Sequence, residues 1–154
     1  MDLKQAFIQI KILHASLFVG VLLLAVLSLV FHNVMDIGEG LAILPANAFY
    51  LIVIVAILLL WASGFFYKRR ISQIDAVLSL DERIRLYRTA VVIRAALIEV
   101  ASLLVIMGYL LSGSLTYLLI AIVPVGSFLT TFPRDEIISE AMELSYSEVQ
   151  KLEE

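Results

Sequence analysis

The sequence has no cysteine, only two histidines and few charged side chains, and each shortage excludes a class of function. Without cysteine the chain has no disulfide, no thiol redox chemistry and no thiolate metal ligand. Two histidines are too few for a histidine-rich metal centre. The formal net charge is −3 at pH 7, so we expect no basic surface for nucleic acid.

The common catalytic patterns are missing as well. The sequence shows no cluster with metal-ligand spacing, no Ser-His-Asp set and no glycine-rich loop that would cradle a phosphate. No pair of intramembrane aspartates is present either. We therefore predict that the protein is not an enzyme and holds no cofactor and no metal.

Apolar side chains are abundant instead. Hydrophobic residues make up 62% of the chain and charged residues 16%, against about half and about a quarter in soluble domains. The first apolar run exceeds the roughly 7–15 residues of a signal peptide and precedes no cleavage site, so we expect it to remain as a span. Four runs are long enough to cross a bilayer: residues 6–31, 47–67, 88–111 and 115–132.

The predicted fold is all-α: an integral membrane four-helix antiparallel bundle made of two helical hairpins. Lys68, Arg69 and Arg70 end the second span, and an amphipathic connection (68–81) follows on the surface or against the bundle. The capping-box sequence from Ser79 to Glu82 predicts that the third helix begins before the membrane. Pro124 is expected to kink the fourth helix.

Residues 133–154 form an acidic cytoplasmic tail, which we expect to be helical in part. Seven acidic and two basic residues follow position 133, and the segment Ser145–Glu148 resembles a second capping box. Two interpretations stay open, because the same composition fits a solvated tail and a helix that docks on a partner.

Basic residues predict the orientation of the chain. Apart from Arg94 in the third run, the lysines and arginines lie in the N-terminal segment, between the second and third spans with the start of the third helix, or in the tail. The other two loops have none, so both termini are expected on the cytoplasmic side. We predict a multi-pass protein of the bacterial inner (cytoplasmic) membrane.

Two ionisable side chains, Arg94 and Glu99, lie inside the third apolar run. Such residues are costly in a membrane, so each is a functional hypothesis. The five-residue spacing places them roughly 140° apart around the helix, so they cannot pair directly. Small residues neighbour Glu99 on its helix face, which predicts that this face packs against another helix.

Antiparallel threading brings further polar residues to the depth of Glu99. We predict a polar intramembrane pocket at the cytoplasmic end of the bundle, made of Lys11, His14, Ser63, Arg94, Glu99, Ser102, Ser127 and Thr130. Three roles for Glu99 stay open: pairing with His14 or Lys11 to fix helix packing, proton or cation handling, and pairing with another subunit. For His14, a hydrogen bond within the bundle and contact with the membrane interface are both open.

Two resemblances accompany this interpretation. The segment Arg94–Ala101, followed by an apolar run and a short turn, locally resembles the carboxylate helix of rotary ATPase proteolipid subunits. The second half of the chain is similar to a family of uncharacterised small four-helix bacterial membrane proteins. That likeness lies in Tyr87-Arg88 with Ile93-Arg94 and Leu97–Glu99, in the segment Tyr109–Leu111 and in the tail from Pro133 to Glu148. It implies a membrane fold and no particular activity.

We expect a small inner-membrane accessory or scaffold protein that acts through helix–helix and tail contacts. Its expected partners are the lipid bilayer and either further copies of itself, as a homo-oligomer, or a larger membrane complex, with no nucleic acid. The alternative is an element of a proton- or cation-coupled transporter that uses the buried Glu99.

Overall fold

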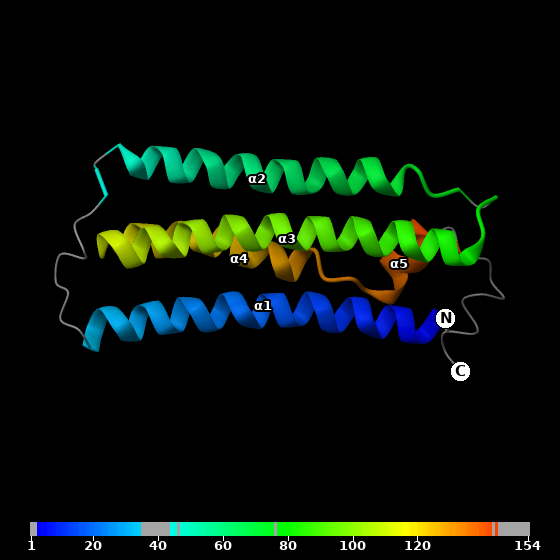
Figure 1. Ribbon diagram of the computed structural model, residues 1–154, viewed down its shortest axis with the longest axis horizontal. Coiled ribbons are helices and arrows are strands. Elements are labelled where there is room, and N and C mark those ends of the chain that lie inside the picture. The colour runs from blue at the N-terminus through cyan, green and yellow to red at the C-terminus, as the bar shows by residue number, and fades with distance from the viewer. Residues whose placement is uncertain (1–2, 35–43, 46, 76, 143, 145–154) are drawn as a thin grey trace.

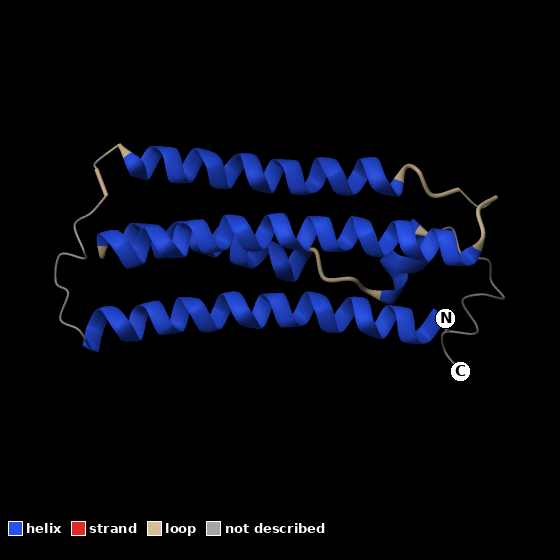
Figure 2. Ribbon diagram, viewed as in Figure 1, coloured by secondary structure: helices blue, strands red, loops and turns tan. Residues whose placement is uncertain are grey.

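The computed structural model describes residues 3–34, 44–45, 47–75, 77–142 and 144, and this part of the chain is helical with no strand. Figure 1 shows three long helices side by side, and Figure 2 shows the described residues outside the helices as loops and turns. The all-α prediction is confirmed at this level. The five helices are α1 (Leu3–Val34), α2 (Ala48–Ile71), α3 (Leu80–Ser112), α4 (Leu115–Thr130) and α5 (Asp135–Ala141).

Three helices, α1, α2 and α3, are long and apolar enough to cross a membrane, and a fourth crossing arises if α4 and α5 count together. The axes of α4 and α5 differ by 72°. At ~1.5 Å per residue α4 alone is about 24 Å long, which is shorter than the ~30 Å hydrocarbon core of a bilayer. These lengths are compatible with a multi-pass membrane protein.

Helix α3 has the start and the end that its sequence encodes. The hydroxyl of Ser79 accepts a hydrogen bond from the backbone N–H of Glu82, and the Glu82 carboxylate accepts one from the Ser79 N–H. The predicted capping box is therefore present. At the other end Gly113 adopts a left-handed backbone with φ of 69°, where glycine has no steric penalty, and its N–H bonds the Tyr109 carbonyl.

The turn at Gly113 brings α4 back along α3 at very short range. Gly108 on α3 faces the ring of Tyr117 on α4, and a Cβ atom at Gly108 would lie 2.5 Å from two ring carbons. Any side chain at position 108 would clash with the Tyr117 ring, so this crossing requires glycine. Small residues have the same role at close helix contacts in membrane proteins.

Helix α4 ends at Thr130, two residues before the predicted end at Phe132. Phe132 precedes Pro133, and a residue before proline is disfavoured in the helical region. Pro124 lies inside α4.

After α2 the chain follows a connection in which the apolar side chain of Ile74 faces the helices. Helix α2 continues to Ile71, and the described residues from there to Ser79 form turns. Ile74 nevertheless packs in a core cluster, so the connection lies against the helices.

Helix α3 is the central element of the fold. It packs against α1, α2 and α4, while α1 and α2 lie on its two sides in Figure 1. One core cluster joins α3 to the other long helices around Ala95, Ile98 and Val105. A second cluster lies at the end of the molecule that holds α5 and the start of α1, which we call the α5 end.

Helix α5 packs on the protein's own helices. The side chains of Ile138 and Met142 are fully buried in the second cluster, with residues of α1 and α3. The guanidinium of Arg83 donates a hydrogen bond to the Met142 carbonyl at 2.9 Å. This part of the tail is therefore docked within the chain, whereas the expected capping box at Ser145–Glu148 lies outside the described residues.

Candidate functional site

A small polar cavity of about 30 Å³ lies where α4 stops, near the α5 end. We call it the polar cavity. Its walls come from all five described helices and from the link between α4 and α5, because the early end of α4 leaves space between the longer helices. The lining residues are His14, Tyr67, Tyr87, Val91, Arg94, Thr130, Thr131, Phe132, Pro133 and Ile137.

His14 enters the polar cavity from α1 and is only 2% exposed. Its Nε2 atom lies 2.9 Å from the Phe128 carbonyl oxygen, which can only accept, so Nε2 carries a hydrogen and donates. The rings of Phe128 and Phe132 contact the imidazole edge-on, with centroids 5.3 and 5.6 Å away. The other ring nitrogen, Nδ1, is enclosed and has no hydrogen-bond partner among the described residues.

Arg94 reaches the polar cavity from α3. Its Cζ atom lies 4.5 Å from the centroid of the Tyr67 ring on α2, a cation–π contact. Within the described chain no carboxylate lies within 4.0 Å of its guanidinium, and no side chain or carbonyl accepts a hydrogen bond from it. The Nε atom is enclosed without a partner. The half-buried cation is therefore compensated by an aromatic face rather than by an anion.

Tyr67 and Tyr87 complete the lining of the polar cavity. Their hydroxyl groups are hydrogen-bonded to each other, and Tyr87 is 1% exposed. The sequence prediction missed both. Tyr87 stands seven residues before Arg94, which is two helical turns and hence the same face of α3, so this spacing was an available signal. Tyr67 is brought in by the packing of α2 on α3, for which the sequence carried no local signal.

Three predicted site residues, His14, Arg94 and Thr130, meet in the polar cavity. The hydroxyls of Thr130 and Thr131 both donate to the Ser127 carbonyl, at 3.1 and 2.7 Å, and keep their lone pairs free.

The other hydroxyl side chains of the predicted pocket bond within their own helices and do not line the polar cavity. Ser63, Ser102 and Ser127 donate to the carbonyls of Leu60, Ile98 and Val123, at 2.7, 2.8 and 2.9 Å. Such local bonds satisfy a serine in an apolar helix without any long-range partner.

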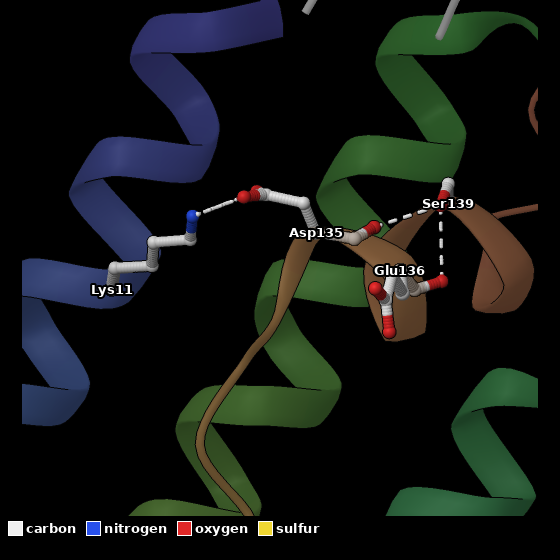
Figure 3. Close-up of polar contacts among 4 residues, drawn as sticks. All are labelled: Lys11, Asp135, Glu136 and Ser139. Atoms are coloured by element: carbon white, nitrogen blue, oxygen red, sulfur yellow. Dashed lines mark hydrogen bonds and ion pairs between the residues drawn. The ribbon is translucent and has the colours of Figure 1, made fainter.

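Lys11 pairs with the tail instead of the polar cavity. Its Nζ atom lies 2.7 and 2.8 Å from the two carboxylate oxygens of Asp135, the first residue of α5 (Figure 3). On the other side of the Asp135 backbone, Ser139 donates to the carbonyls of Asp135 and Glu136. The ion pair therefore ties α5 to α1.

Glu99 also lies outside the polar cavity. Its side chain is half-buried at the flank of α3 and forms no hydrogen bond or ion pair with the described residues. Its carboxyl oxygens are not enclosed either. The structure thus separates the two ionisable residues of the third apolar run, with Arg94 turned inward and Glu99 at the surface of the helix assembly.

A partly exposed row of residues surrounds Glu99 along α3. Its members recur at spacings of three and four, so they lie on one side of the helix. The neighbouring Val100 is 51% exposed. We call this row the α3 stripe, and it consists of Val92, Ala96, Glu99, Leu103, Met107 and Leu110.

Across the described ranges, no group of three or more histidine, aspartate or glutamate residues is placed to hold a metal ion. No protein-family model, curated protein or solved structure matches the chain. The resemblances stated from the sequence therefore stay predictions, and any function must be argued from the polar cavity and the α3 stripe.

Proposed function

We propose that the protein is a small accessory or scaffold protein of the bacterial inner membrane, with both termini in the cytoplasm, that self-associates through the α3 stripe. The observation that carries this proposal is Glu99. Its carboxyl group reaches the surface of an apolar helix without a partner in its own described chain. In hydrocarbon such a group needs a hydrogen-bonding partner, and a second chain supplies one.

A second copy of the chain suits the α3 stripe. Copies with one membrane orientation are related by an axis along the membrane normal, so that Glu99 meets the Glu99 of the other copy at one depth. Two protonated carboxyl groups can each donate and accept one hydrogen bond. The three- and four-residue spacings of the stripe also fit a left-handed crossing of parallel helices. Interhelical hydrogen bonds in membranes contribute roughly 0.6–2 kcal/mol.

The absence of cysteine makes this proposal directly testable. A single cysteine replaces Ala96 on the α3 stripe, and a control cysteine replaces Leu129 on α4, which is 61% exposed and lies about as far from the Gly113 turn. We expect oxidation in native membranes to give a disulfide-linked dimer with Ala96→Cys and little with Leu129→Cys. Equal cross-linking of the two variants, or none in either, contradicts the proposal.

Glu99 itself is tested in the Ala96→Cys background. Glu99→Gln keeps a group that donates and accepts, so we expect cross-linking to persist. Glu99→Leu removes both functions, so cross-linking is expected to fall severalfold. If both variants cross-link like the parent, Glu99 does not hold the copies together.

The competing function is a proton- or cation-coupled transporter element that uses Glu99. One observation favours it: the carboxyl oxygens are accessible rather than locked in an ion pair. Purified protein in liposomes provides the test, with ion flux measured for the parent and for Glu99→Gln. Flux that depends on Glu99 replaces the scaffold proposal. A third outcome is that the protein is a subunit of a larger complex. Gentle extraction of the protein from native membranes, followed by mass spectrometry, tests this, because a different protein recovered in stoichiometric amount would identify such a complex.

A further inference from the structure

We propose that the polar cavity binds one small monatomic anion of the chloride class, together with a proton on His14. This proposal does not rest on the proposed function, because the α3 stripe and Glu99 take no part in it.

The first argument is the uncompensated charge of Arg94. A guanidinium has five N–H donors, and none of them bonds an acceptor in the described chain. The Tyr67 ring covers one face of the cation, which leaves the donors at its edge without acceptors. A buried cation in this state requires water or an anion.

The second argument is size. A cavity must offer ~10–15 Å³ to hold one water molecule, so about 30 Å³ accommodates two waters or one monatomic ion. The polar cavity therefore has room for a small ion, and a halide is the simplest anion that fits it.

The third argument is the hydrogen-bond direction at His14. Because Nε2 donates to the Phe128 carbonyl, the neutral ring has a bare Nδ1 that can only accept. A water molecule suits that state, since a water can accept from the Arg94 guanidinium and donate to the neutral ring. In the imidazolium form Nδ1 carries a hydrogen, and both groups then donate to the same occupant. That arrangement suits an anion.

Charge balance links the anion to the proton. The resting cavity carries one positive charge, from Arg94. A proton on His14 adds a second, and the anion restores the original sum, so each ligand favours the other. The remaining titratable groups at the cavity are the hydroxyls of Tyr67 and Tyr87, and Lys11 is paired with Asp135 one turn away on α1. No described carboxylate lines the cavity to take the role of the anion.

Thermal unfolding of the full-length protein in detergent tests the proposal, with chloride exchanged for gluconate at constant ionic strength. We expect chloride to raise the unfolding temperature more at about pH 5.5 than at about pH 8, where a histidine is mostly neutral. The apparent affinity for chloride is expected to weaken by up to tenfold per pH unit. A temperature that does not depend on chloride overturns the proposal and leaves a cavity filled by water.

Variants locate the effect. We expect Arg94→Gln to abolish the response to chloride, and His14→Asn, which keeps a donor for the Phe128 carbonyl, to remove its pH dependence. Ser127→Ala lies outside the cavity lining and serves as the control that keeps both. Because a variant can lose stability, the linewidth of chloride NMR provides a second measurement on the folded fraction. Chloride binding that survives Arg94→Gln, or that is independent of pH in the parent, contradicts the proposed site.

Discussion

Arg94 shows how a single charged side chain is accommodated at the edge of an apolar helix. The aromatic face of Tyr67 attracts the guanidinium, and a contact of this kind contributes about 0.5–2 kcal/mol. Tyr67 also bonds the hydroxyl of Tyr87. The ring and the hydroxyl of one tyrosine therefore have separate roles, which substitutions can distinguish.

We expect Tyr67→Phe to cost only the hydroxyl bond, about 1 kcal/mol in free energy of unfolding. Tyr67→Leu should cost a further ~0.5–2 kcal/mol because the cation–π contact is lost as well. Reversible unfolding in mixed detergents measures both. When Arg94 is replaced by glutamine, Tyr67→Leu should cost no more stability than Tyr67→Phe, because the cation is gone. If the difference between these two variants is the same with and without Arg94, the Tyr67 ring acts by packing alone.

At the scale of the element, the contact between α3 and α4 depends on one missing side chain. The ring of Tyr117 that faces Gly108 is itself held, since it is buried and packs edge-on against Phe49 with centroids 5.3 Å apart. The ring has little room to yield to an added methyl group.

Gly108→Ala is therefore expected to destabilise the protein by about 1–3 kcal/mol through overpacking. Gly126→Ala is the matched control, because a Cβ atom there meets nothing within 4 Å and alanine is the better helix former. Thermal unfolding of the two variants gives the comparison. Equal unfolding temperatures for the two variants would show that α4 shifts freely on α3.

Helix starts, helix ends and turns could be predicted where residues close in the sequence determine them. The capping box at Ser79 and the turn at Gly113 depend on residues within one turn of each, so both could be read from the sequence. The end of α4 was within reach too, because Pro133 disfavours helix at Phe132. The meeting of Tyr67 with Arg94 depends on how α2 is aligned along α3, and the sequence alone does not encode this alignment in any short segment.

Glu99 illustrates the same limit. The small residues around it predicted a packed face, and Ala95 and Ser102 are indeed buried. The carboxyl group lies at the edge of that face, where a rotation of one residue position, about 100°, decides between the interior and the surface. The sequence identified Glu99 as a charged residue inside an apolar run. The direction of its side chain depends on how α1, α2 and α4 pack around α3.

For the whole molecule, the proposed orientation yields a prediction that uses the cysteine-free background. Ser114 follows the Gly113 turn, and Ser72 follows the basic end of α2. A membrane-impermeant maleimide should label Ser114→Cys in cells whose inner membrane is intact, and should label Ser72→Cys only after the membrane is opened. The reverse pattern would invert the proposed topology.

The central place of α3 has a consequence for biogenesis. Helices α1 and α2 are made first, yet each packs mainly on α3 rather than on the other. On the proposed membrane topology, the first half of the chain enters the bilayer as two helices that lack their common neighbour, and they assemble only when the third helix arrives. A ribosome stalled before residue 80 would therefore leave two inserted helices that drift apart, exposed to proteases and chaperones of the membrane.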